Sequence, residues 1–292
     1  MTAYSYPFKD EKEWKKFWKS FDNVERTDIL EVNSKAVINN VQCEGKVYYI
    51  TGTFARKWRG LKADKQTYVF QIGEHKNVHG HFINCDISEL LAKNDLCPWQ
   101  KSYYWACPSS MDPHRKNTIH LPQIEKNQST GIARQNCWDT LWGMIQGLRD
   151  YDGKSLSSMN MKDWWDLDRM RWVGPFVIGH LKGLDEFQEY HQSRFLEFIP
   201  DRNGLDGKNK VIFSDGNYAG LCGHPSMSCT HKGEYFGFKP ENRQPRLFVM
   251  DFWSCENNRL VDNWCQIDMI DLFRSINSDY ERMIDETLHY TR

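Results

Sequence analysis

Two carboxylates and an indole share one face of a predicted strand near the C-terminus. Residues 259–268 read Arg-Leu-Val-Asp-Asn-Trp-Cys-Gln-Ile-Asp, and side chains alternate between two faces in an extended chain. Asp262, Trp264 and Asp268 therefore point the same way. A carboxyl group beside an indole lies in partly apolar surroundings, which raise the pKa of such a group toward that of a general base. The pattern indicates proton transfer by Asp268 in a pocket walled by Trp264.

A structural role for Asp268 stays open. It directly precedes a predicted helix at Met269–Ile276, and Asp is a preferred N-cap because its carboxylate accepts hydrogen bonds from the first backbone N–H groups. Asp86 also follows a predicted strand and precedes a short predicted helix at Ile87–Lys93. Asp86 is therefore a second catalytic candidate, and a helix cap is its alternative as well.

Two further polar residues interrupt apolar segments. His191 lies in a helix predicted over Leu184–Phe198, where it either supports a pocket or is a hydrogen-bonded core residue. Asp251 lies in the apolar strand predicted over Leu247–Cys255. It is either paired in a pocket or placed on an exposed face, and the sequence leaves both alternatives open.

Metal-binding residues are sparse. His79 and His81 share one face of a predicted strand, and His75 precedes them, but no further ligand is nearby. The nine cysteines are an odd number without CxxC spacing, which favours buried thiols in a reducing compartment over disulfides or zinc. No metal site is predicted.

Charge and hydropathy exclude several classes of partner. The 292 residues carry 38 Lys and Arg against 39 Asp and Glu, a balance that argues against a nucleic-acid or anionic-membrane partner. No apolar run approaches the roughly 20 residues that cross a bilayer. The first residues lack the pattern of a signal peptide. These features predict a cytoplasmic protein.

Periodicity predicts a mixture of helices and strands. Spacings of three and four between apolar residues predict helices at 11–22, Ile132–Arg149, Met161–Arg171, Leu184–Phe198 and Met269–Ile276. Segments rich in β-formers between turn residues predict strands at Ile29–Val41, Lys46–Phe54, Tyr68–Gly73, His75–Cys85, Lys210–Ser214, Tyr218–Cys222, Met227–Gly237, Leu247–Cys255 and Leu260–Ile267.

The two halves of the chain carry similar signals in the same order, which predicts an internal duplication. The matched positions are Thr53 and Thr230, Gly60 and Gly237, Phe82 and Trp264, and Asp86 and Asp268. We expect a degenerate first repeat over residues 1–95, an irregular connection over 96–131 and a complete second repeat over 132–292.

The second half also resembles a known family. Its motifs are Trp172-Val173-Gly174-Pro175-Phe176, Gly179, Gly183, Phe187, His191, Phe198-x-Pro200-Asp201, Thr230 to Gly237, and Leu260-Val261-Asp262-Asn263-Trp264 followed by Asp268. Their order over residues 132–276 resembles the SnoaL-like polyketide (ester) cyclases of the nuclear-transport-factor-2-like superfamily. Where that family often has Glu-His-Trp, this chain has Asp-Asn-Trp.

The resemblance implies an α+β fold, with the chain forming two tandem cone-shaped barrels. Each barrel has a bent antiparallel sheet plus helices, and the first is shortened at its N-terminus. The implied reaction is an intramolecular aldol closure that uses no metal or organic cofactor. The implied ligand is an apolar small molecule containing a carbonyl group.

The resemblance also implies roles for residues of the second half. The general acid/base of that family corresponds to Asp268. Beside it we expect Trp264, Trp172 and Phe176 to form pocket walls, and His191 and Asn263 to orient polar groups. A non-catalytic binding or scaffold protein of the same fold is the alternative, because a fold alone does not establish an activity. A homodimer stays open as an assembly state.

Overall fold

One mixed sheet forms the centre of the fold. The structure is a computed structural model that describes residues 4–5, 24–38, 41–58, 61–75, 78–85, 131–175, 177–204, 211–215, 217–223 and 225–289. Its 11 strands lie in the order β1 (Tyr4–Ser5), β5 (Val78–Cys85), β4 (Leu61–His75), β3 (Val41–Trp58), β2 (Val24–Ile38), β8 (Val211–Asp215), β9 (Tyr218–Gly223), β10 (Val249–Glu256), β11 (Arg259–Ile267), β6 (Arg171–Val173) and β7 (His180–Lys182). Neighbouring strands are antiparallel, except that β6 runs parallel to β11.

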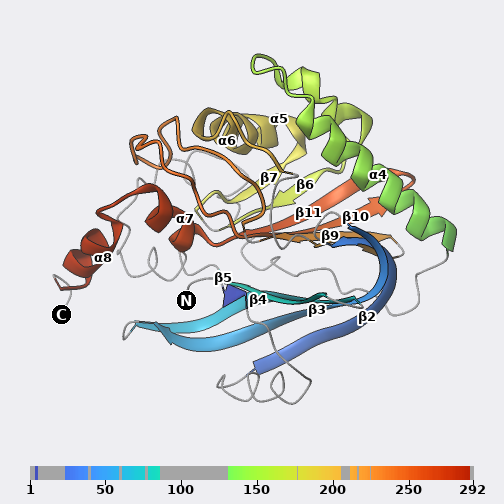
Figure 1. Cartoon of the computed structure of the whole chain (residues 1–292), viewed down its shortest axis with the longest axis horizontal. Coiled ribbons are helices and arrows are strands. Elements are labelled where there is room, and N and C mark those ends of the chain that lie inside the picture. The colour runs from blue at the N-terminus through green and yellow to red at the C-terminus, as the bar shows by residue number, and fades with distance from the viewer. Residues whose placement is uncertain are drawn as a thin grey trace.

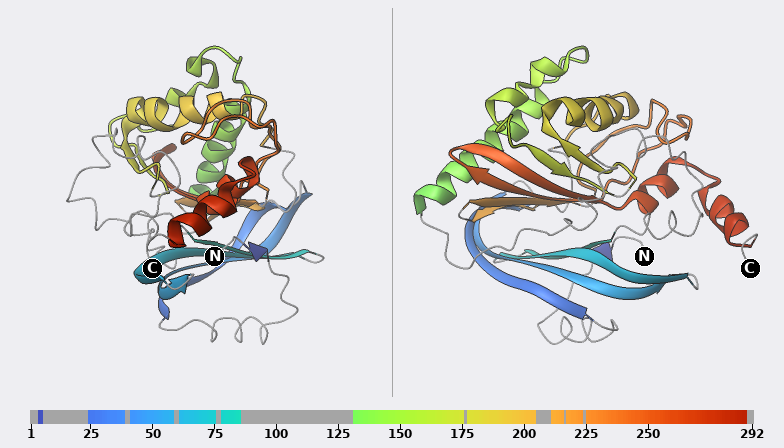
Figure 2. Two further views of the ribbon diagram at one scale, coloured as in Figure 1. Left: turned by 90° about the vertical axis from the view of Figure 1, so that its left-hand side faces the viewer. Right: turned by 180° about the vertical axis from the view of Figure 1, so that it is seen from behind.

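The sheet folds back on itself to make two of three layers (Figure 1). β2 pairs with β8 only over Ala36–Ile38 and pairs with β3 along the rest of its length. β2 therefore bends away from β8, and β2 to β5 pass beneath β9, β10 and β11 (Figures 1 and 2). β5 lies against β11. The strands of the first half thus cover the outer side of the second-half sheet.

Helices form the third layer on the opposite side of that sheet (Figure 1). They are α4 (Gly131–Arg149), α5 (Gly183–Phe187), the π-helical segment η5 (Gln188–Gln192) and α6 (Ser193–Phe198). In α4 the spacing of Leu141, Met144, Ile145 and Leu148 makes an apolar stripe, and Leu141 is fully buried. Burial of this stripe against the sheet holds α4 in place.

The two faces of β10 and β11 are both buried, but by different layers. Asp251 pairs with Cys265 and Trp253 with Asn263, whereas Phe252 pairs with Trp264. Because side chains alternate, the first two pairs face the helices and the third faces β2 to β5. Phe252 is 3% exposed and Trp264 is 8% exposed. The alternation therefore decides which side chains reach the space under the helices.

The C-terminal region ends in two helices. β11 leads directly into α7 (Met269–Ile276), which matches the predicted helix, and α8 (Tyr280–His289) follows where no helix was predicted. Residues 225–248 form an ordered loop, so the strand predicted over Met227–Gly237 is wrong. Backbone bonds from Lys232 and Gly233 to the carbonyl of Phe198 hold this loop on the end of α6.

The helix predictions for the second half differ in accuracy. The predictions for Ile132–Arg149 and Leu184–Phe198 are confirmed, apart from the π-helical turn inside the second. The helix predicted over Met161–Arg171 is wrong, because only the 3₁₀ turn η4 (Met161–Asp163) forms there, followed by irregular chain and the start of β6. A second 3₁₀ turn, η3 (Leu156–Met159), precedes η4. The predicted helices at 11–22 and Ile87–Lys93 lie outside the described residues.

The second half has the expected α+β architecture, but the structure does not support two tandem barrels. The strands of both halves join through the β2–β8 pairing into one sheet. Residues 53–58 belong to β3, whereas residues 230–237, their expected counterparts, lie in the loop. The matching sequence signals therefore do not correspond to matching structures at these positions.

The described helices have no membrane-spanning character, since none of them combines the necessary length with the necessary apolar composition.

Gly233 provides a test of the loop packing. A Cβ added at Gly233 would lie 2.2 Å from the Glu197 carbonyl oxygen and 2.7 Å from its carbon, both backbone atoms that cannot turn aside. We expect Gly233→Ala to lower the free energy of unfolding by about 1–3 kcal/mol through overpacking. Chemical denaturation followed by circular dichroism measures this, with the exposed loop variant Lys239→Ala as the control. Equal stability of the two variants would contradict the packing of this loop.

Candidate functional site

A cavity of about 400 Å³ lies between the helices and the helix-facing side of the sheet. Its lining residues come from α4, α6, the segments that follow these two helices, the loop 225–248, and strands β9 and β10: Met144, Ile145, Leu148, Arg149, Tyr151, Leu196, Pro200, Arg202, Asn203, Gly204, Leu221, Ser226, Met227, Val249, Asp251 and Trp253. Most of these side chains are apolar. Pockets of this size and composition suit small organic ligands, with the few polar groups fixing their orientation.

Asp251 is the carboxylate in the cavity wall. Its position on β10 places it on the helix-facing side, and it is half-buried. The Asn263 side-chain amide Nδ2 donates to Asp251 Oδ1 at 3.1 Å and to the Phe252 carbonyl at 3.2 Å. Two bonds from one amide fix the orientation of Asn263, and Asn263 in turn fixes one oxygen of Asp251.

The Cys265 thiol is a second neighbour of this carboxylate. Burial raises the pKa of Cys265 well above its ordinary value, and the charge and hydrogen bond of Asp251 raise it further. The thiol therefore stays protonated at neutral pH and donates to the carboxylate. Asn263 and Cys265 are successive helix-facing residues of β11, so the β10–β11 register places both donors beside Asp251.

Arg202 is a half-buried cation in the cavity lining. Its Nη2 donates to the Leu148 carbonyl at 3.3 Å and approaches the Met159 sulfur at 3.7 Å. Burial lowers the pKa of Arg202 to about 10, so the guanidinium remains charged at neutral pH. Among the described residues, no carboxylate forms an ion pair with it. Within the described part of the chain, the Arg202 charge in the cavity wall therefore has no countercharge.

His191 lies in an aromatic cluster next to the cavity lining. Its ring stacks on Trp172 with centroids 4.3 Å apart and also contacts Phe187 and Phe195. Burial, together with the charge of Arg202, lowers the pKa of His191 to about 3. The residue is partly exposed as a whole, but its Nδ1 atom is buried and has no hydrogen-bond partner among the described residues. The imidazole is therefore neutral at physiological pH.

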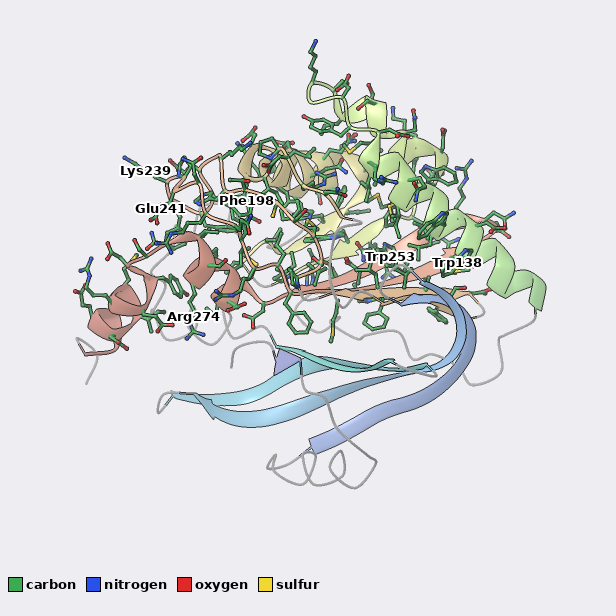
Figure 3. All side chains as sticks on the ribbon, viewed as in Figure 1. Trp138, Phe198, Lys239, Glu241, Trp253 and Arg274 are labelled. Carbon is green, nitrogen blue, oxygen red and sulfur yellow. The ribbon has the colours of Figure 1, made fainter. Side chains whose placement is uncertain are left out.

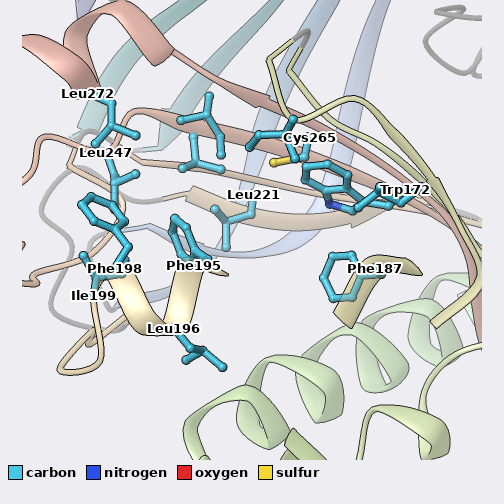
Figure 4. Close-up of a cluster of buried hydrophobic side chains, with 14 of the residues drawn as sticks. Trp172, Phe187, Phe195, Leu196, Phe198, Ile199, Leu221, Leu247, Cys265 and Leu272 are labelled. Carbon is cyan, nitrogen blue, oxygen red and sulfur yellow. The ribbon is translucent and has the colours of Figure 1, made fainter. Parts of the chain in front are cut away.

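Trp172 closes the sheet side of this cluster. It is 2% exposed and contacts Phe187 as well as His191. In Figure 4, Phe195 and Phe198 project from the helix toward the sheet, and Trp172 lies between the sheet and Phe187. Trp172 and His191 thus meet as predicted neighbours, but neither is part of the cavity lining.

Asp268 lies outside the cavity lining. It is fully buried, and its Oδ1 accepts from the Asp271 backbone N–H at 2.9 Å, which makes it the N-cap of α7. Arg246 forms a two-pronged ion pair with Asp271, at 2.7 and 3.1 Å, and the charge of Asp268 adds to the raised pKa of Arg246. Asp268 therefore fastens the loop and α7 to the end of β11, as the capping alternative expected.

The other predicted site residues are dispersed. Trp264 lies on the face of β11 opposite the cavity. Asp262, which shares that face, is held by Arg171 and by the Ser254 hydroxyl at 2.8 Å. Asp86 and Phe176 lie outside the described residues. Of the predicted set, the structure brings Asp251 and Asn263 together at the cavity.

Among the lining residues that were not predicted are Tyr151, Arg202 and Trp253. Trp253 follows Asp251 on the same face of β10 and lies under α4 (Figure 3), so the alternation that singled out Trp264 could have found it. Arg202 lies in the polar turn Asp201-Arg202-Asn203-Gly204. Such a turn normally faces solvent, so nothing in the sequence indicates that its cation is buried.

Within the described residues, no group of three or more His, Cys, Asp or Glu side chains could hold a metal ion.

Comparison with known proteins gives a family match for part of the chain. Residues 168–276 match the family model for the SnoaL-like polyketide cyclases. This segment contains Arg202, Asp251 and Asn263, but less than half of the chain. No curated protein matches the sequence.

Solved structures align with about half of the chain at low identity. AclR, a candidate hydroxylase from Streptomyces galilaeus, is 16% identical with a TM-score of 0.38, over 48% of this chain and 95% of its own. A candidate SnoaL-like polyketide cyclase from Jannaschia sp. CCS1 is 9% identical with a TM-score of 0.40, over 49% and 93%. An NTF2-like protein from Burkholderia xenovorans LB400 is 14% identical with a TM-score of 0.37, over 49% and 98%. None of these likenesses transfers a function to the chain.

The capping role of Asp268 predicts a loss of stability on truncation. Asp268→Ala removes the buried acceptor of the Asp271 N–H, and we expect it to lower the free energy of unfolding by about 1–2 kcal/mol. Thermal unfolding measures the effect, with the exposed acid variant Asp285→Ala on α8 as the control. An unchanged melting temperature for Asp268→Ala would show that this cap does not stabilise α7.

The neutral state of His191 predicts a stability that depends on pH. Because its folded pKa of about 3 lies below the ordinary value of 6.5, the unfolded chain binds the proton first as the pH falls. The contribution is complete above pH 6.5 and is lost progressively as the pH falls from 6.5 toward 3.

Replacing His191 with Phe isolates this contribution. Phe keeps the stack on Trp172 and cannot be protonated, so the stability of His191→Phe relative to the unmodified protein should rise by about 1–2 kcal/mol between pH 7 and pH 5. Urea titrations at both values measure the difference, and titration of the other histidines cancels between the two proteins. A difference that stays constant with pH would contradict the buried, neutral state of His191.

Proposed function

We propose that the chain is a SnoaL-like enzyme that transfers a proton next to the carbonyl group of an apolar small molecule, with Asp251 as the acid/base. The observation that carries the proposal is the carboxylate of Asp251 in the wall of a largely apolar cavity, held by the Asn263 amide at 3.1 Å. A fixed carboxylate in a site of low polarity has the geometry that proton abstraction requires.

The proposed reaction needs one carboxylate and one carbonyl. Asp251 accepts a proton from the carbon next to the carbonyl, and the electron pair of the broken C–H bond forms the enolate. The enolate carbon then attacks a second carbonyl of the same molecule, and the resulting alkoxide takes the proton back from Asp251. Atoms and charge balance over the cycle, and no cofactor takes part. In a molecule without a second carbonyl, the same proton transfer gives an isomerisation.

The neighbours of Asp251 support each part of this scheme. The amide of Asn263 donates to Oδ1 of Asp251, which fixes the orientation of the carboxylate that takes the proton. Trp253 and Tyr151 supply aromatic walls for a ring-containing substrate. The stacked pair of Trp172 and His191 forms the rigid support beyond the cavity. His191 is neutral, so it adds no charge to the region.

The match of residues 168–276 to the SnoaL-like polyketide cyclases supports this reaction class. The proposal places the acid/base at Asp251 instead of Asp268, because Asp251 lines the cavity and Asp268 caps a helix. A binding protein without catalysis is the alternative that the experiment separates.

The test is the exchange of C–H hydrogens for deuterium in an apolar cyclic ketone. We expect the protein to accelerate exchange next to the carbonyl of β-tetralone in D₂O, as followed by proton NMR. Asp251→Asn keeps the size of the side chain but removes the base, and should reduce the acceleration at least about a hundredfold. Asp268→Asn serves as the matched control and should exchange β-tetralone at a rate close to that of the unmodified protein once both are shown to be folded.

Two results would contradict the proposal. If the unmodified protein binds β-tetralone without accelerating exchange, the chain is a binding protein. If Asp268→Asn loses the acceleration and Asp251→Asn keeps it, the catalytic carboxylate is the one at the end of β11.

A further inference from the structure

Arg202 is a charged group that the proposed reaction does not use. It lines the cavity, is half-buried, and its partners among the described residues are one backbone carbonyl and one thioether sulfur. Both of these contacts are made by Nη2, which leaves Nε and Nη1 without a protein acceptor among the described residues. A half-buried cation that has no countercharge among the described residues would be stabilised by a ligand that supplies one.

Capping of α4 explains only part of this arrangement. Arg202 donates to the carbonyl of Leu148, in the last turn of α4, where a cation is favourable. One neutral acceptor and a sulfur atom do not neutralise a guanidinium, however. A purely structural cap could also lie at the surface, as Arg149 does at the end of the same helix. The remaining donors therefore point to an anion as the missing partner.

The charges of the cavity are arranged asymmetrically. The charged side chains among the described lining residues are those of Arg202, Arg149 and Asp251, two cations and one anion. Arg149 is the last residue of α4 and Arg202 follows α6, both in the helical layer, whereas Asp251 belongs to β10 in the sheet. A negatively charged group of a ligand is attracted to the helical side and repelled by the carboxylate on the sheet side.

We infer that the cavity takes an apolar carbonyl compound that carries one oxyanion group, a carboxylate or a phosphate, bound by Arg202. Guanidinium groups match such oxyanions in charge and in hydrogen-bond geometry. With its oxyanion on Arg202, the rest of the molecule extends across the apolar lining toward Asp251. The inference rests on the proposed function for the position of the substrate, and it adds the substrate's charge and orientation.

Two fluorescent probes that differ by one anionic group test the inference. Anilinonaphthalene sulfonate and N-phenylnaphthylamine share the same ring system, and only the first carries an oxyanion. We expect the unmodified protein to bind the sulfonate more tightly. Arg202→Gln should weaken sulfonate binding about tenfold or more and leave the affinity for the neutral probe within about twofold. Arg202→Lys retains a charge and should recover part of the preference.

Three controls locate the effect. Arg282→Gln removes one cation from the exposed surface of α8 and should leave both affinities unchanged. Met227→Trp narrows the cavity from its loop side and should weaken both probes together. Circular dichroism confirms the fold of each variant. Competition by naphthoate and by naphthyl phosphate then shows whether the site prefers a carboxylate or a phosphate. The compound that carries the preferred oxyanion should displace the sulfonate probe at the lower concentration.

Several outcomes would overturn the inference. They are equal binding of the two probes by the unmodified protein, an equal loss of both probes in Arg202→Gln, and displacement by neutral naphthylmethanol as effective as displacement by either anion. These results concern binding alone. Deuterium exchange can fail while Arg202 still selects the anionic probe, so failure of the inference and failure of the proposed reaction are separable.

Discussion

The pairing of β10 with β11 is the interaction on which the candidate site depends. It opposes Asp251 to Cys265 and Trp253 to Asn263, and thereby gathers a carboxylate, its two donors and an indole on the face under the helices. A slip of β11 by one residue in this register would turn Asn263 and Cys265 toward β2 to β5 and bring Trp264 to the face under the helices, away from Phe252 and next to Asp251 and Trp253. The register is specified because each face is buried against a different layer. The long strands of the first half thus contribute to the site indirectly, by covering the outer side of the sheet that carries it.

The charge states of the ionisable side chains in and beside the cavity determine which ligands it can bind. His191 avoids the free-energy cost of a buried charge because it stays neutral, since burial and the nearby guanidinium both oppose its protonation. Arg202 cannot do the same, because a guanidinium with a pKa of about 10 keeps its proton at neutral pH. Asp251 is oriented by two neutral donors, an amide and a thiol. The cavity therefore has a carboxylate on the sheet side and a guanidinium on the helical side, and a ligand with an anionic end and a carbonyl group would match both under the proposed function.

The sequence predicted those features that depend on local periodicity. The apolar stripe of α4 and the Asp before α7 were visible, and both alternatives for Asp268 were stated, of which the cap is the one observed. The choice of strand face was not predictable, because apolar residues lie on both sides of β11 and alternation alone does not say which side meets the helices. Asp251 was recognised as polar in an apolar strand, but its side depended on the same choice. Arg202 gave no signal, since its burial results from the packing of α4, η3 and the turn after α6, which are distant in sequence. The duplication failed for a related reason: similar sequence signals were placed in a strand in one half and in a loop in the other.

The most direct test of the central claim is a crystal structure of the protein with naphthoate bound. We expect the naphthalene ring to occupy the cavity between α4 and β10, the carboxylate to contact the guanidinium of Arg202, and the far edge of the ring to be directed toward Asp251. A ligand bound outside this cavity, or one whose carboxylate lies away from Arg202, would contradict it.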